Sequence, residues 1–140
     1  MLTPGSKLVE EKIFQGATLQ HLFLIIFGLR RLCQVDGDSM LPTLRQGDIV
    51  IYRPVDPENF VARQGSIVVV QNPQDSQGLI IKRIHKENTL GLDLRGDNEE
   101  NSIDSRQFGL VNYNCLRGIV EQIIFQPGKE ISEQTSRSIT

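Results

Sequence analysis

The sequence predicts a mostly β fold in which short strands form a barrel or a coiled sheet. Between residues 31 and 126, about five to seven short apolar or alternating runs are separated by Gly, Pro and Asn turn signals. Such spacing is typical of small all-β domains. With 140 residues, the chain is long enough to bury a core within a single domain.

Residues 1–30 are expected to form a helical or apolar segment that packs on this domain. Lys7–Phe14 has a weak helical pattern, with apolar residues four apart. The apolar run Leu22–Leu29 either extends that helix or begins a strand, because so short a run fits both. It has about half of the ~20 residues that span a bilayer, so we expect it to join the core. Contact of Leu19–Leu29 with a membrane is the alternative.

The strand signals begin at Arg31 and end near residue 126. Each run alternates or is continuously apolar, and turn residues separate one run from the next. Gly118, inside the last run, indicates a bulge or a bend. Residues 127–140 are polar and are expected to form a flexible tail. In order, the runs are RLCQV, DIVIYRPV, GSIVVVQNP, GLIIKRIHKE, TLGLDLRGD and FGLVNYNCLRGIVEQIIF.

The composition argues against several function classes. Lys plus Arg total 15 and Asp plus Glu total 17, so a net charge of −2 gives no electrostatic footprint for nucleic acid. The two cysteines, Cys33 and Cys115, are far apart and are expected to be buried free thiols. The two histidines form no metal motif, so neither a metal nor another cofactor is expected. No secretory signal is evident, which favours a cytoplasmic location.

Two residues could supply hydrolytic chemistry. Ser39 lies in "VDGDSMLPTLRQGDIV", a Gly-containing turn with a proline shortly after it, which can expose a serine hydroxyl and aim its backbone N–H at an oxyanion. Lys82 shares a strand face with Ile80 and Ile84. If that face is buried, desolvation lowers the pKa of the lysine and makes it a general base for the serine. An ordinary turn serine and an edge-strand lysine are the alternatives.

A third stretch is dense in polar residues. "RGDNEENSIDSRQFG", residues 95–109, offers an Asp–Arg pair and serine hydroxyls that could brace a site or orient a lysine amine. A solvated loop is the alternative.

Taken together and in this order, "GDSMLPTL…GD", "IKRI" and "GDNEENSIDSRQFG" resemble the type I signal peptidase family of Ser-Lys endopeptidases. The resemblance covers residues 35–118. It implies a coiled β-sheet barrel like that of signal peptidases and of the C-terminal domain of SOS-type repressors, with a short N-terminal helix. One position departs from the pattern: where family members often have a hydroxyl residue that completes the oxyanion hole, this chain has Gly37.

The resemblance also implies a role for each matching residue. Ser39 resembles the nucleophile, Lys82 the general base, and Met40 the residue packed beside this dyad. Ser102 resembles the hydroxyl that orients the lysine, and Asp104 and Arg106 the bracing pair. The substrate would be a precursor protein whose N-terminal leader binds as an extended strand, with no role for nucleic acid. The walls of its groove would be Gln34, Val35 and Asp36 on one side, and Leu79, Ile80 and Ile81 on the other.

The identity of the substrate has competing interpretations. The short chain most resembles the maturation proteases of nickel superoxide dismutase, which remove a leader from the dismutase precursor. A membrane-associated signal peptidase or an organelle-type processing peptidase, acting on export signals, is the alternative. A self-cleaving SOS-type repressor is disfavoured, because no Ala-Gly or Cys-Gly pair precedes Ser39. An inactive β domain that binds peptides by strand addition is a further alternative.

Overall fold

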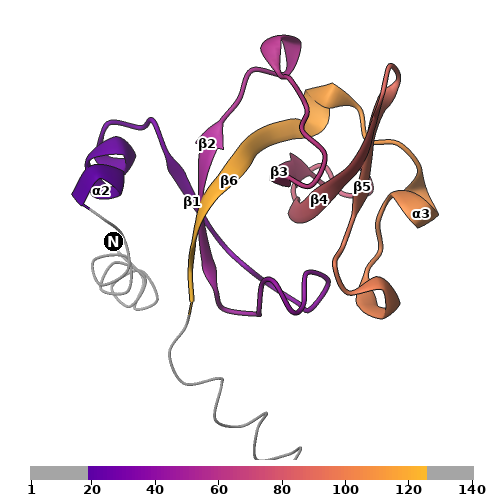
Figure 1. The fold of residues 1–140 in the computed structure, drawn as a ribbon, viewed down its shortest axis with the longest axis horizontal. Helices are drawn as coiled ribbons and strands as arrows, with labels where there is room; N and C mark the ends of the chain where they lie inside the picture. Colours follow the sequence, from indigo (N-terminus) through magenta and orange to yellow (C-terminus); the bar gives the residue numbers. More distant parts are fainter. Residues whose placement is uncertain (1–18, 126–140) are drawn as a thin grey trace, which may run out of the picture.

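The structure, a computed structural model, describes residues 19–125; the helix expected at Lys7–Phe14 and the tail at 127–140 lie outside the described residues. The predicted mostly β fold is confirmed. Six strands form one antiparallel sheet in the order β1-β2-β6-β3-β4-β5 (Figure 1). The strands are β1 (Arg31–Gln34), β2 (Ile49–Pro54), β3 (Ile67–Gln71), β4 (Leu79–Asn88), β5 (Gly91–Arg95) and β6 (Leu116–Ile124). The helical segments are α2 (Leu19–Ile26), η1 (Pro57–Asn59), η2 (Glu99–Asn101), α3 (Ser105–Phe108) and η3 (Tyr113–Cys115).

Strand β6 gives the sheet its coil. It appears in Figure 1 as a long curved ribbon whose first part pairs with β3 and whose later part pairs with β2. The pairing with β3 shifts register at Val69–Val70, beside Gly118, so the bulge predicted there is confirmed. A Cβ on Gly118 would lie 2.6 Å from the carbonyl oxygen of Arg53, which explains why the close approach of β2 requires glycine.

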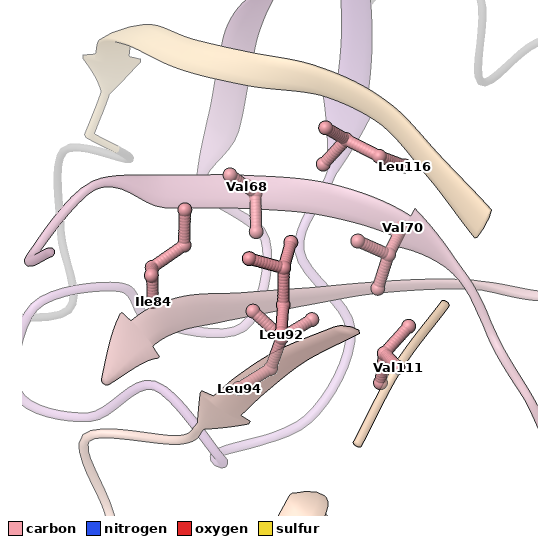
Figure 2. Packing of buried hydrophobic residues seen from close by; sticks show 7 residues of the cluster. All are labelled: Val68, Val70, Ile84, Leu92, Leu94, Val111 and Leu116. Atoms are coloured by element: carbon pink, nitrogen blue, oxygen red, sulfur yellow. The ribbon is translucent and has the colours of Figure 1, made fainter. Parts of the chain in front are cut away.

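The core has apolar clusters on both faces of β3 and β4. Figure 2 shows the larger cluster, in which side chains from β3, β4, β5 and β6 converge. Its buried members are Val68, Val70, Ile84, Leu92, Leu94, Val111 and Leu116. A second cluster joins the β1–β2 loop to the opposite face and contains Val35, Met40, Leu44 and Val50. Burial on both faces accounts for the continuously apolar β3 run, in which the alternation expected of a half-buried strand is missing.

Helix α2 resolves the ambiguity of the N-terminal apolar run in favour of a helix, which packs against the core on one side but is not fully buried in it. No residue of α2 is buried. Leu22 and Ile25 are half-buried against Ile49, Ile51 and Ile124, while other apolar side chains of the segment stay exposed. Within residues 19–125, no helix has the length and hydropathy needed to cross a bilayer. Figure 1 places α2 at the end of the sheet away from β4 and β5.

Candidate active site

The Ser39 turn belongs to the loop that joins β1 to β2. Its base is closed by hydrogen bonds from Val35 N to Asp48 O (2.8 Å) and from Gly47 N to Val35 O (2.8 Å). The buried side chains of Met40 and Leu44 anchor the loop in the second cluster. These apolar anchors hold the turn against the sheet and leave the Ser39 hydroxyl at the surface of the groove described below.

Lys82 reaches this turn from the middle of β4. The predicted face is confirmed: Ile80 and Ile84 pack in the larger cluster with β5, while Ile81 packs in the second cluster on the other side. Lys82 is buried, with 4% of its surface exposed. Its Nζ donates to Ser39 Oγ at 2.8 Å and to Ser102 Oγ at 3.2 Å. The edge-strand alternative, in which the ammonium stays in water, is therefore wrong.

Burial lowers the pKa of Lys82, because the charged amine loses its hydration. The carboxylate of Asp104 opposes this shift and the guanidinium of Arg106 adds to it. The net effect is a lowered pKa, so the Lys82 amine loses its proton at a lower pH than an ordinary lysine does. A neutral amine has a free lone pair, which is what a general base requires.

Asp104 is the polar centre behind the lysine. This fully buried carboxylate accepts hydrogen bonds from Ser102 Oγ (2.6 Å), Gly96 N (2.8 Å) and the backbone and side chain of Arg106. Burial alone would raise the pKa of Asp104, but the hydrogen bonds from Arg106, Ser102 and Gly96 outweigh it and hold this pKa well below the usual range. The predicted Asp–Arg pair is thus present, and the solvated-loop alternative for residues 95–109 is wrong.

The direction of these bonds fixes how the lysine is presented. Ser102 donates its only hydroxyl proton to Asp104, so its oxygen is left to accept from Lys82. A neutral Lys82 that donates one proton to Ser102 can turn its lone pair toward the Ser39 hydroxyl. The geometry can therefore move a proton from Ser39 to Lys82.

Residues 96–98 also contribute to the site, although no role was predicted for them individually. Gly96 lies between Ser39 and Ser102, where a Cβ would come within 2.5 Å of Ser39 O. Asn98 donates its backbone N–H to Ser39 O (2.9 Å) and its side-chain amide to Asp38 O (3.0 Å). The sequence signals were the clustering of Gly, Asp and Asn directly after β5 and the place of these residues at the start of the third motif of the family resemblance.

Arg83, on the opposite side of β4 from Lys82, ties three loops together. It forms a two-bond ion pair with Asp97 (2.8 and 2.6 Å) and donates to Gly65 O (2.7 Å). Thr43, in the Ser39 loop, donates to the same carboxylate at 2.5 Å. The bond from Arg83 raises the pKa of the guanidinium and lowers that of Asp97.

Two hollows are lined by both Ser39 and Lys82. The smaller, of about 120 Å³, is lined by all six predicted wall residues together with Cys33, Ser39, Met40 and Lys82. The larger, of about 300 Å³, adds Gly37, Asp38, Asn72, Gln74, Asn101, Ile103 and Phe108 to Asp36, Ser39, Ile80 and Lys82. The two hollows share Asp36, Ser39, Ile80 and Lys82, and together they are called the groove beside the nucleophile candidate.

The two cysteines were the other residues considered for chemistry. Cys33 and Cys115 are free, as expected, but half-buried rather than buried. Burial raises the pKa of the Cys33 thiol. Within residues 19–125, no three His, Cys, Asp or Glu side chains come together as metal ligands.

Comparison with known proteins identifies the family of the chain. The profile of the family described as "Peptidase S24-like" matches residues 29–108, which include Ser39, Lys82, Ser102, Asp104 and Arg106. The chain is 29% identical over 107 residues to mitochondrial inner membrane protease subunit 1 of Mus musculus, covering 59% of this chain and 61% of that protein. It is 30% identical to the Homo sapiens subunit 1 over 102 residues, with the same shares. It is 29% identical to mitochondrial inner membrane protease subunit 2 of Danio rerio over 123 residues, covering 72% of this chain and 67% of that protein.

The chain spans 61% of the length of the subunit 1 relatives. Because the matched profile covers more than half of the sequence, the chain belongs to the Peptidase S24-like family.

Proposed function

We propose that this protein is a serine endopeptidase with a Ser39–Lys82 dyad that removes N-terminal leader segments from precursor proteins at a membrane. The observation that carries the proposal is the 2.8 Å contact between Lys82 Nζ and Ser39 Oγ, with the lysine buried and both residues lining the groove. The family, whose matched profile includes both residues, supports peptidase chemistry.

The reaction is acyl transfer. Neutral Lys82 takes the hydroxyl proton of Ser39, whose oxygen attacks the scissile carbonyl carbon. The oxyanion accepts a hydrogen bond from the Ser39 backbone N–H. The C–N bond then breaks, and the proton on Lys82 passes to the leaving amine. Water gives a proton to Lys82 and attacks the ester, and Ser39 leaves with the proton that Lys82 returns.

The substrate binds as a strand between two sheet edges. β5 pairs with β4 only from Arg83 onward, so the other edge of Leu79–Lys82 is open. Alternate residues of an antiparallel strand direct their backbone groups to opposite edges. The backbone N–H of Ile84 bonds to Ser66 O on the β3 side. By alternation from Ile84, the backbone N–H and C=O of Ile81 and Leu79 are directed to the open edge.

The second open edge belongs to the end of β1. Val35 uses its N–H and C=O for the bonds to Asp48 and Gly47. By the same alternation, the backbone groups of Gln34 and Asp36 are directed away from β2 and toward the groove. An extended peptide could therefore pair on both of its sides, and its side chains would alternate between the smaller hollow and the larger one.

Helix α2 supports the location at a membrane. Phe23 and Ile26 have 61% and 80% of their surfaces exposed, and Leu19, Phe27 and Leu29 are exposed with them. Such a row favours insertion into a lipid interface over contact with water. The relatives described above carry the names of inner membrane proteases and not of dismutase maturation proteases. The membrane reading therefore replaces cytoplasmic processing of nickel superoxide dismutase as our proposal.

The test of the chemistry is cleavage of precursors by the purified chain, with new N-termini read by mass spectrometry. Ser39→Ala and Lys82→Met should each lower the rate by about 10³-fold or more. The matched controls are Ser76→Ala and Lys86→Met, an exposed serine and an exposed lysine of β4. Cleavage by Ser39→Ala or Lys82→Met at the wild-type rate would refute the dyad.

The same assay separates the substrate classes. Precursors with export-type leaders and the nickel superoxide dismutase precursor are presented in parallel, each with anionic vesicles and without them. We expect cleavage of the export-type leaders only. Cleavage of the dismutase precursor alone would instead support maturation of nickel superoxide dismutase as the function.

The test of the location is sedimentation with the same vesicles. Replacing both Phe23 and Ile26 by Ser should release the chain, whereas Val61→Ser, at a position 77% exposed elsewhere on the surface, should not. A wild-type chain that stays in the supernatant would refute membrane binding without affecting the dyad.

A further inference from the structure

We propose that Asn98 is a positioning residue that aims the Ser39 backbone N–H at the oxyanion, and this inference rests on the proposed peptidase function. The starting observation is that Asn98 bonds to the carbonyl on each side of the nucleophile. Its side-chain amide donates to Asp38 O at 3.0 Å, and its backbone N–H donates to Ser39 O at 2.9 Å.

The Asp38–Ser39 peptide plane connects the Asn98 side chain to the oxyanion. In a trans peptide, the N–H points in the direction opposite to the C=O of the same plane. Among residues 19–125, Leu41–Pro42 is the only cis bond, so the Asp38–Ser39 bond is trans. Asp38 O accepts from both Asn98 Nδ2 and Leu41 N (3.2 Å). With both lone pairs of this carbonyl in use, the plane cannot rotate without breaking a bond.

The N–H on the far side of that plane is free to serve a substrate. Within the described part of the chain, no hydrogen bond from the Ser39 N–H is found. It points away from Asn98, and Asn98 lines neither of the two hollows that flank Ser39. Hydrogen bonds to the carbonyl also polarise the plane and strengthen its N–H as a donor. The role matters here because Gly37 supplies no hydroxyl as a second donor.

The chain around Asn98 is held independently of its side chain. Asp97 is clamped by Arg83 and Thr43, and Gly96 N donates to Asp104. The backbone bond from Asn98 to Ser39 O survives any side-chain substitution. Removing the amide should therefore free the Asp38–Ser39 plane without undocking the turn.

The experiment measures kcat and KM for Asn98→Ala and Asn98→Asp, the latter keeping the size but replacing the donor by an acceptor. Loss of an oxyanion donor costs about 10²–10³ in kcat, so a donor that is present but misaimed should cost about tenfold, with KM little changed. Glu100→Ala, an exposed neighbour, is the matched control. Melting temperatures establish that each variant is folded.

A substrate with a thioamide at the scissile bond isolates the oxyanion contribution, because sulfur accepts hydrogen bonds weakly. If Asn98 acts through the oxyanion, the oxygen-to-sulfur change should slow the wild type more than it slows Asn98→Ala. The midpoint of the kcat–pH profile, which reports Lys82, should be the same in both proteins. Equal thioamide penalties, a shifted midpoint or unchanged kcat in Asn98→Ala would each overturn the inference. An inactive wild type would overturn the proposed function, and this inference with it, whereas an active wild type with unchanged Asn98→Ala overturns this inference alone.

Discussion

Asp104→Asn is the sharpest stability test of the site, because it changes one atom of a fully buried carboxylate. Asp104 accepts five hydrogen bonds: three reach Oδ2, from Gly96 N, Ser102 Oγ and Arg106 Nη2, and two reach Oδ1, from Arg106 N and Nε. An asparagine can keep its carbonyl oxygen at the Oδ2 position. Its amide then meets the two Arg106 donors, and both of those bonds are lost.

The expected cost follows from these two bonds. A hydrogen bond to a charged group contributes about 1.5–3 kcal/mol, and removing one partner of a buried ion pair costs about 3–5 kcal/mol. Arg106 retains Glu99 as a second partner at 2.9 Å, which limits the loss to the lower part of this range. We expect the free energy of unfolding to fall by about 3 kcal/mol, a large fraction of the ~5–15 kcal/mol of a typical domain.

Urea denaturation measures this loss directly. With a slope of about 1–3 kcal/mol per molar urea, the midpoint should fall by roughly 1–3 M with the slope unchanged. Glu99→Gln, at a side chain 81% exposed, is the control and should change the free energy of unfolding by less than about 1 kcal/mol. A loss below about 1 kcal/mol for Asp104→Asn would refute the reasoning, since it would mean that the five bonds are not made in solution.

Acid provides a second measurement of the same group. The pKa of Asp104 is lower in the folded protein than its ordinary value of 3.8. Its contribution to stability is therefore fully present above about pH 5 and is lost as the pH falls through the folded pKa. The difference in unfolding free energy between wild type and Asp104→Asn should stay constant from neutral pH to about pH 5 and shrink in stronger acid. A difference that grows on acidification would contradict the assigned sign.

Three further predictions concern the dyad and its surroundings. The value of kcat should rise with pH to a plateau whose midpoint lies below the ordinary lysine value of 10.5, because burial lowers the pKa of Lys82; a midpoint at or above 10.5 would contradict this. Gly96→Ala should lower kcat by at least about tenfold, since its Cβ would push against Ser39 O, and wild-type kinetics would show that the loop yields freely. Cys33 should react with iodoacetamide at pH 7 several-fold more slowly than an unfolded control peptide, because burial raises its pKa and so lowers its thiolate fraction, and equal rates would contradict that burial.

Much of the fold could be predicted from the sequence because strand signals are local. Alternation placed Lys82 on the face of Ile80 and Ile84, and the same face is buried in the structure. The glycine and proline residues around Ser39 predicted a turn there. The exposure of α2 could not be predicted, because an apolar run specifies only that water is unfavourable. Whether a core or a lipid surface covers that run depends on the tertiary contacts of β2 and β6.

The polar network behind Lys82 shows why the loop residues were harder to interpret than the dyad. The dyad depends on one contact whose chemistry is readable from residue type. Arg83 and Asn98 instead donate to backbone carbonyls, those of Gly65 and of the Ser39 turn. A carbonyl partner leaves no mark in the sequence, because every residue has one. The residues that aim a nucleophile are therefore visible only once the fold brings the loop after β5 against the loop before β2. The same hydrogen bonds contribute both to folding stability and to kcat. Stability measurements alone therefore cannot give the contribution of these residues to catalysis, and kinetic measurements are needed.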